Sequence, residues 1–178
     1  ILTPPSDTFA RGAEAGFVTD DFSLAYFTAE TILRNGGKID EKTAVESLLC
    51  WAGHEEYYGK YVGPTTKASI KKLLGEETTA TYPFLKYDCA KATNGSAMKI
   101  GAAALFSPGD VDKAIQDAIT ICLPTHANNL SLAGACAVAA GVAKAMEQGA
   151  TLFDVVKAGL YGAKKGNELG SQVATVLA

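Results

Sequence analysis

The chain has 178 residues and a formal net charge of −3, with 48% hydrophobic and 20% charged residues. This composition is typical of a globular protein that can bury a sizeable core. The weak negative charge gives no support for nucleic-acid binding, and no stretch is apolar enough for long enough to span a bilayer. The four cysteines form no Cys-x-x-Cys pair and no cluster with histidine, so we expect reduced, mostly buried thiols and a cytoplasmic protein.

Apolar residues at helical spacing, together with capping signals, predict most of the secondary structure. The expected helices cover residues 22–34, 40–51, 65–74, 98–106, 110–121, 128–148 and 151 to about 165. Asp40 and Asp110 are the expected N-caps of two of them. The tyrosine-rich segment 53–64 is predicted to be a loop, and residues 1–16 and 75–97 are predicted to be irregular.

The pattern along the whole chain favours a purely helical protein. No alternating run of β-branched residues with the length of a strand lies between turn signals. The helix expected over 128–148 is the longest and is rich in alanine and glycine, which lets neighbouring backbones approach closely. Gly166 and Gly170 are expected to interrupt the last helix. We therefore predict a single all-α domain over residues 1–178, a compact helical array with segment 128–148 at its centre.

The triplet Thr19-Asp20-Asp21 precedes the first predicted helix and follows the loop Gly16-Phe17-Val18. Two neighbouring carboxylates and a hydroxyl supply hard oxygen ligands, which Mg²⁺ prefers. The same residue types also cap helices and complement the positive end of the helix dipole. Two neighbouring side chains cannot complete an octahedral Mg²⁺ shell, so the triplet taken alone favours capping.

Two later segments carry further candidate residues. Within Thr93–Lys99, the turn Asn94-Gly95-Ser96 offers backbone N–H groups that could surround phosphate oxygens, and Lys99 could add positive charge. An ordinary turn before a helix is the alternative. His126 follows Pro124-Thr125 at the start of a predicted helix, where its ring could face a cleft, although a lone histidine is more often structural.

In this order and spacing, the three segments resemble the ADP-ribosylglycohydrolase family. The family's Thr-Asp-Asp signature usually continues with another threonine, where this chain has Phe22. The resemblance implies the compact orthogonal helical array of that family. It also implies that Thr19, Asp20 and Asp21 are ligands of a centre with two Mg²⁺ ions, with Asp20 and Asp21 essential for catalysis.

The resemblance assigns substrate-binding roles to the later segments. Asn94, Gly95, Ser96 and Met98 are expected to line the pocket for the diphosphate and distal ribose of ADP-ribose. His126 is expected to contact bound ADP-ribose rather than to act as a general base.

Two weaker features of the sequence each have a functional and a structural explanation. The loop Gly63-Pro64-Thr65-Thr66 matches a family segment that lines the cleft, but capping by either threonine explains it equally well. An aromatic group lies beside Trp51 and consists of His54, Tyr57, Tyr58 and Tyr61. These residues could form a wall that stacks on adenine, but ordinary packing is the favoured explanation.

The family's terminal motifs are expected to lie outside this sequence. Its Gly-Asp-Ala-Leu-Gly segment would precede Ile1, and the Asp-Thr-Asp-Thr segment that completes the metal centre would follow Ala178. The first residue is also not methionine. We therefore expect a fragment that contains about half of the family's functional residues.

The implied function is that of a Mg²⁺-dependent glycoside hydrolase that removes ADP-ribose, or a related ribosyl group, from a modified protein or small molecule. Its expected partners are ADP-ribose or an ADP-ribosylated substrate, with no nucleic acid and no membrane. One alternative is a non-catalytic helical module that binds ADP-ribose or a nucleotide beside an incomplete metal site. Another is a purely structural helical protein whose motif residues are caps and turns.

Overall fold

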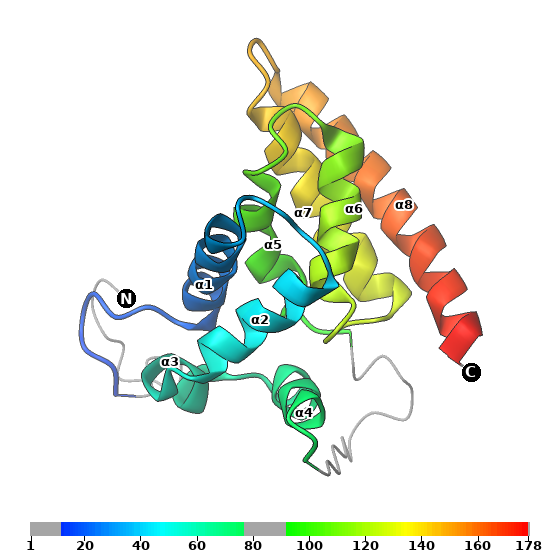
Figure 1. Ribbon diagram of the computed structural model, residues 1–178. Helices are drawn as coiled ribbons and strands as arrows, with labels where there is room; N and C mark the ends of the chain where they lie inside the picture. Colours follow the sequence, from blue (N-terminus) through cyan, green and yellow to red (C-terminus); the bar gives the residue numbers. More distant parts are fainter. Residues whose placement is uncertain (1–11, 77–91, 178) are drawn as a thin grey trace.

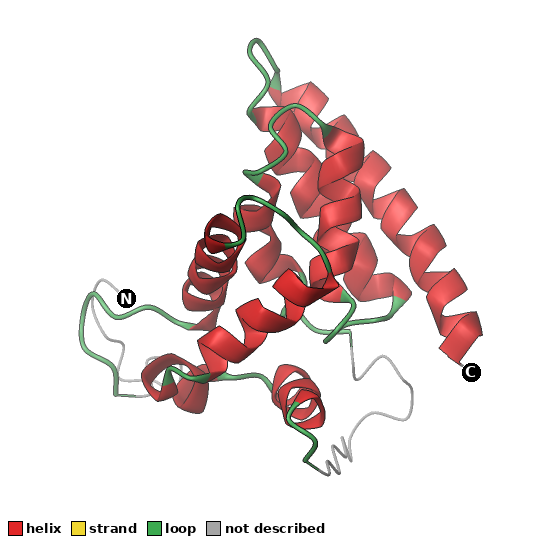
Figure 2. Ribbon diagram, in the orientation of Figure 1, coloured by secondary structure: helices red, strands yellow, loops and turns green. Residues whose placement is uncertain are grey.

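The computed structural model describes residues 12–76 and 92–177, with side chains described as far as Ser171. Within these residues the chain forms eight helices and no strand (Figure 2), which confirms the all-α prediction. The helices are α1 (Asp20–Arg34), α2 (Glu41–Ala52), α3 (Glu55–Tyr61), α4 (Pro64–Leu73), α5 (Ala97–Ala104), α6 (Val111–Cys122), α7 (Asn129–Ala145) and α8 (Leu152–Leu177).

Helix α7 is the centre of the array, as its small residues predicted. It packs against α5, α6 and α8, and Figure 1 shows α6, α7 and α8 side by side. Ala135, Ala139, Ala140 and Ala143 are completely buried along it. On the other side of the array, α1 packs against α5 and α2 against α6, while α3 and α4 lie farthest from the α7–α8 pair (Figure 1).

Local capping chemistry fixes several helix starts where the sequence predicted them. The Asp40 side chain accepts a hydrogen bond from the Thr43 backbone N–H, and Asp110 does the same for Lys113. Asn128 caps α7 by accepting from the Ser131 N–H. These bonds satisfy N–H groups that lack partners within the helix, so the starts of these three helices follow from residues close in sequence.

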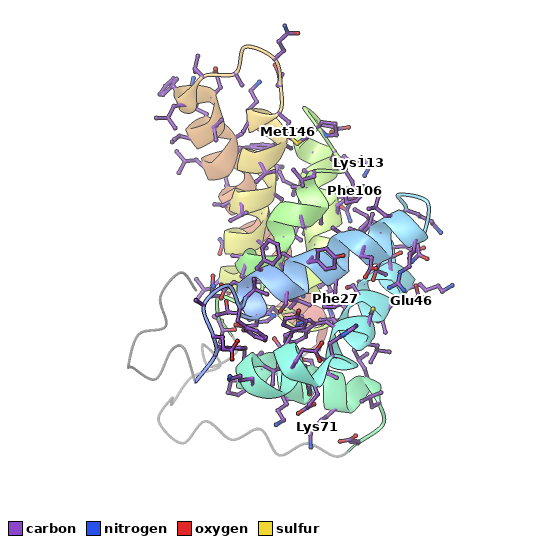
Figure 3. The ribbon with its side chains drawn as sticks, turned by 90° about the vertical axis from the view of Figure 1, so that its left-hand side faces the viewer. Phe27, Glu46, Lys71, Phe106, Lys113 and Met146 are labelled. Atoms are coloured by element: carbon purple, nitrogen blue, oxygen red, sulfur yellow. The ribbon has the colours of Figure 1, made fainter. Side chains whose placement is uncertain are left out.

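The prediction of a loop over 53–64 was wrong, because α3 occupies most of that segment. Tertiary packing explains the difference: the Phe27 ring stacks on His54 at 4.3 Å between centroids and lies 6.1 Å from the ring of Tyr57. Figure 3 shows Phe27 on the side of α1 that faces α3. Burial of these rings outweighs the weak local preference of the segment for a helix. The irregular structure predicted over 77–91 lies outside the described residues.

Helix α8 also differs from its prediction, since it continues through both glycines to Leu177 and is the longest helix. The glycines are required by close packing against α7. A Cβ atom at Gly162, Gly166 or Gly170 would overlap the α7 backbone near Cys136, Leu132 or Asn129, respectively. Spacing of four residues places the three glycines on one face, and that face allows the two backbones to approach. The same glycines that looked like helix breakers therefore stabilise the helix pair.

A second apolar cluster fixes the position of α1. Leu24, Phe27, Leu48, Trp51 and Ile70 pack together from α1, α2 and α4. The Trp51 indole N–H, which is fully buried, donates to the Ser23 hydroxyl at 3.0 Å. This contact ties the first turns of α1 to α2, and so it positions the residues that begin α1.

The described helices include none that is both long enough and apolar enough to cross a membrane. Cys50, Cys122 and Cys136 are free thiols, and the last two are buried, as expected. Burial raises the pKa of Cys122 to about 11 and that of Cys136 to about 12, which leaves both protonated and unreactive at neutral pH. The prediction for Cys89 lies outside the described residues.

Replacing a packing glycine of α8 tests this account. We expect Gly166→Ala to lower the free energy of unfolding by about 1–3 kcal/mol, because its methyl group would overlap the Leu132 carbonyl. Gly101→Ala is the control: it is also helical, but its added methyl group meets no atom within 4 Å. Removing this glycine should raise stability by about 0.5–1 kcal/mol. Urea unfolding of both variants measures the contrast, and equal effects would refute the packing role.

Candidate functional site

The triplet Thr19-Asp20-Asp21 forms the start of α1. Thr19 is the N-cap, with extended backbone angles, but its side chain does not bond to the free N–H groups of the helix. Its Oγ1 instead donates to Asp21 Oδ2 at 3.2 Å. Asp20 and Asp21 occupy the first turn, where the positive end of the helix dipole favours carboxylates. The hydroxyl and the Asp21 carboxylate therefore face each other, which side-chain capping does not explain.

A hydrogen bond joins this triplet to the second predicted segment. The Asn94 side-chain amide donates to Asp21 Oδ1 at 3.2 Å, across 73 residues of sequence. Asn94 and Asp21 are both exposed. Helices α1 and α5 pack against each other and bring the turn before α5 to the start of α1. Two of the three segments selected from the sequence therefore meet at the surface.

The third segment, which contains His126, lies beneath the Asn94 turn. The His126 ring is completely buried, and each of its nitrogens contacts a threonine hydroxyl. Nε2 is 2.8 Å from Thr93 Oγ1, and Nδ1 is 2.8 Å from Thr125 Oγ1. The ring therefore does not face an open cleft, in contrast to the expectation. It supports the exposed Thr93, and through it the Asn94 turn, from beneath.

Lys99 extends this contact into a chain of hydrogen bonds. Its ammonium group, buried within α5, donates to Thr125 Oγ1 at 3.1 Å. An ammonium can only donate, so Thr125 Oγ1 accepts from Lys99. The single hydrogen of the Thr125 hydroxyl has two acceptors in reach, His126 Nδ1 at 2.8 Å and the Cys122 carbonyl at 3.4 Å, and the shorter contact favours His126. In this arrangement His126 Nε2 carries the ring hydrogen and donates to Thr93. This order leaves the Thr93 hydroxyl hydrogen available to a ligand at the surface.

The electrostatics of the chain agree with a neutral imidazole. Burial and, second, the charge of Lys99 lower the pKa of His126 to about 4. Burial also lowers the pKa of Lys99, because a desolvated ammonium is less stable than a solvated one. His126 is therefore unprotonated at neutral pH, so one of its nitrogens must accept a hydrogen bond.

Gly95 is required where the turn crosses the histidine. A Cβ atom there would lie 2.9 Å from His126 Cε1 and 3.3 Å from Thr66 Oγ1. The fourth segment, Gly63-Pro64-Thr65-Thr66, therefore also reaches the site. Gly63 is the N-cap of α4, so neither threonine has the capping role considered from the sequence.

Ser96 and Met98 point away from the exposed turn. The Ser96 hydroxyl is buried and donates to the Ser131 carbonyl of α7 at 3.0 Å. Met98 is half-buried and packs against the cluster around Trp51. Ser96 as a whole is almost completely buried, so its side chain links α5 to α7 and the residue offers no donor at the surface.

The donor atoms of the triplet suit Mg²⁺ in kind, and one pair of them also suits it in spacing. Adjacent ligands of an octahedral ion with bonds of 2.0–2.1 Å lie about 3 Å apart, and Thr19 Oγ1 and Asp21 Oδ2 are 3.2 Å apart. Three side chains do not supply six ligands, and the described residues contain no group of three or more histidine, cysteine, aspartate or glutamate side chains that could hold a metal ion. Any remaining ligands would come from water, substrate or other parts of the protein.

An aromatic cavity of about 300 Å³ lies beside the triplet. Its lining includes Phe17, Val18, Phe22, Tyr26, Phe27 and Tyr57. From the sequence, ordinary packing is favoured over an adenine-stacking wall for His54, Tyr57, Tyr58 and Tyr61, and of this group Tyr57 lines the cavity. Tyr58 instead packs edge-on against Trp51 with 5.4 Å between ring centroids, and His54 stacks on Phe27. The sequence did not identify three residues of the lining, Phe17, Phe22 and Tyr26, as part of a site. The signal that could have found two of them is that Phe22 and Tyr26 lie one helical turn apart.

Stability should depend on pH through His126. Between about pH 6.5 and pH 4, the unfolded chain binds a proton at this histidine that the folded chain excludes. Acidification through this range should therefore lower the free energy of unfolding, by about 3 kcal/mol in total. Urea unfolding at several pH values measures the slope. A His126→Gln variant should have a smaller slope, and an unchanged slope would contradict the neutral, buried ring.

The Thr125 hydroxyl should contribute more to stability than an ordinary helical threonine. Thr125→Val removes the hydrogen-bond partner of Lys99 and of His126 Nδ1 at once, which should lower the free energy of unfolding by at least about 2 kcal/mol. The control is Thr120→Val, whose hydroxyl bonds to the Gln116 carbonyl of its own helix. That change should stay within about 0.5 kcal/mol. Similar losses in both variants, by thermal or urea unfolding, would refute the chain.

Comparison with known proteins agrees with the motifs. The ADP-ribosylglycohydrolase family model matches residues 2–178. An uncharacterized protein, YegU, of Escherichia coli (strain K12) is 31% identical over 131 residues, covering 72% of this chain and 38% of that protein. The chain thus matches less than half the length of this relative, and no solved structure matches it. The chain belongs to the ADP-ribosylglycohydrolase family.

Proposed function

We propose that this chain is part of a Mg²⁺-dependent glycoside hydrolase that removes ADP-ribose, or a related ribosyl group, from a modified protein or small molecule. The observation that carries the proposal is the hydrogen bond from Asn94 to Asp21. It joins a candidate metal-binding triplet to a candidate phosphate-binding turn in a member of this family. A substrate with a ribose and a phosphate could contact both at once.

Thr19, Asp20 and Asp21 would hold the metal ion through their side-chain oxygens. When bound, Mg²⁺ would supply positive charge that binds vicinal ribose hydroxyls and orients the anomeric carbon. The Asn94 amide fixes the rotamer of Asp21 by bonding to the oxygen opposite the one that faces Thr19. Preorganisation of this carboxylate lowers the cost of arranging the site when substrate binds.

The Asn94 turn would bind the phosphate end of the substrate. The backbone N–H group at Gly95 and the Thr93 hydroxyl hydrogen are donors of the kind that phosphate oxygens accept. His126 would act through Thr93 and Gly95 as a positioning residue, because its ring is buried beneath both. Asp20 and Asp21 would also stabilise the positive charge that develops on the sugar as the glycosidic bond breaks.

The remaining ligands of a two-metal centre are expected from family segments that do not occur in this sequence. The free thiols of the described cysteines support a cytoplasmic location. A binding module without catalysis is the second candidate function. It is favoured by the small number of metal-binding side chains that the described residues bring together.

The double variant Asp20→Ala/Asp21→Ala tests the metal assignment. In thermal unfolding, ADP-ribose at a hundredfold excess over Kd should stabilise the unmodified protein by about 2.7 kcal/mol. This stabilisation should require Mg²⁺, and the double variant should lose the requirement together with any Mg²⁺-dependent release of ADP-ribose. The matched control is Glu55→Ala/Glu56→Ala, an acidic pair in the first turn of α3, which should behave like the unmodified protein.

Three outcomes separate the candidates. Mg²⁺-dependent turnover that survives the aspartate double variant would refute the metal assignment. Stabilisation by ADP-ribose that is independent of Mg²⁺, without turnover in the natural full-length protein, would identify the binding module. The absence of any stabilisation by ADP-ribose would refute both candidates.

A further inference from the structure

We propose that the aromatic cavity beside the triplet binds the leaving group of the substrate, and that this group is a planar, uncharged heteroaromatic ring of the nucleobase type. The inference rests on the proposed glycosidase function and specifies its substrate class. The substrate would then be an N-riboside. Four properties of the cavity lead to this conclusion: its position, its size, its aromatic walls and its lack of charge.

The cavity lies next to the residues that would hold the ribose undergoing cleavage. Gly16, Phe17 and Val18 line it immediately before the triplet, and Phe22 and Ser23 line it immediately after. The adenine of a bound ADP-ribose would be separated from that ribose by a diphosphate and a second ribose. A ring in this cavity is therefore most directly explained as a group bonded to the ribose at the triplet.

The size and lining of the cavity suit a small ring. Its floor includes Phe27 and Ser23, which are buried, and its volume of about 300 Å³ lies in the range of small-molecule sites. Phe22 and Tyr26 form one wall and are 61% and 55% exposed, although both are large aromatic residues. Phe17 and Tyr57 form another, with stacked rings 5.4 Å apart.

Aromatic walls favour an aromatic ligand. Exposed rings on successive turns of one helix leave apolar surface in contact with water, which a stacked ring would remove. The tryptophan and phenylalanine beneath are already packed, so α1 offers a firm support. Nucleobases stack on such side chains whatever their hydrogen-bonding pattern.

The electrostatic surroundings favour a neutral ring over a cation such as a guanidinium. None of the described residues that line the cavity has a charged side chain, so a cation would lose its hydration without a counterion. Lys60 Nζ lies 5.8 Å from the centroid of the Phe17 ring, so one aromatic wall already faces a positive charge. Asp20 and Asp21 are next in sequence to the lining but are not part of it, and in the proposed function their carboxylates would bind Mg²⁺ rather than serve as counterions for a ligand in the cavity.

The corresponding reaction is hydrolysis of an N-glycosidic bond. The oxygen of water forms a bond to the anomeric carbon as the bond from that carbon to the ring nitrogen breaks. The electron pair of the broken bond stays on the nitrogen, and one proton of the water is transferred to it. The products are the free sugar and the neutral base, and no oxidant or reductant is needed.

Trp51 provides a direct test of binding. It is the single tryptophan of the chain, and its indole N–H bonds to Ser23, which lines the cavity. We would titrate the protein with adenine in the absence of Mg²⁺ and follow tryptophan fluorescence, excited at wavelengths that adenine does not absorb. Saturable change is expected with adenine, and none with ribose or methylguanidinium.

Variants on the exposed wall locate the binding site. Phe22→Ala and Tyr26→Ala should each weaken adenine binding by about 5- to 150-fold, the range for loss of a stacking partner. Tyr26→Phe keeps the ring and should bind normally. So should Phe153→Ala, which removes an equally exposed aromatic side chain from α8. In turnover assays, Phe22→Ala should lower kcat/KM more for a riboside with an aromatic leaving group than for one with an aliphatic leaving group.

Failure of this inference is distinguishable from failure of the proposed function. Absence of adenine binding, equal binding by all variants, or tighter binding of methylguanidinium would overturn the aromatic site and leave the Mg²⁺-dependent reaction untouched. Normal, variant-sensitive adenine binding without any Mg²⁺-dependent turnover in the natural full-length protein would support the cavity as a ring-binding site and refute the glycosidase on which its role as a leaving-group site depends.

Discussion

The hydrogen-bonded chain from Lys99 through Thr125 and His126 to Thr93 is the interaction on which the candidate site depends. It begins with the buried ammonium of Lys99 and ends at the exposed hydroxyl of Thr93, so buried groups fix the position of a residue at the surface. Because an ammonium only donates and the Thr125 hydrogen has its shorter contact with His126, this arrangement directs each hydrogen bond of the chain toward the surface. The turn that bears Asn94 is therefore supported by a buried polar network, and Asn94 in turn orients Asp21.

The helix core explains why this network is rigid. Thr125 and His126 lie between α6 and α7, and Ser96 anchors α5 to α7 through the Ser131 carbonyl. Helix α7 is itself fixed by α8, whose glycine face permits direct backbone contact. The position of the surface turn thus depends on packing deep in the array. A substitution at Gly166 would affect the site through the position of α7, and one at Thr125 through loss of the hydrogen-bonded chain.

The features that could be predicted from the sequence are those that depend on residues close together along the chain. Caps at Asp40 and Asp110 use neighbours three residues away, so their helices could be predicted. Helix α3 could not, because the contact with Phe27 comes from another helix. The triplet, the Asn94 turn and His126 were selected by motif, and the structure brings them together. The burial of His126 was not foreseen, since the sequence does not show that Gly95 and Thr93 cover the ring.

Phe22 connects the unforeseen cavity to the family signature. At this position the family usually has a threonine, and the sequence alone marks the phenylalanine only as a departure from the motif. In the structure that residue forms a cavity wall while its neighbour Asp21 bonds to Asn94. Adjacent side chains on a helix point about 100° apart. In the proposed function, one turn of α1 would therefore present carboxylates to the metal and ribose and an aromatic ring to the leaving group. A change at Phe22 would then alter the group that is recognised without moving the proposed metal ligands, so substrate choice could diverge while the metal chemistry stayed the same.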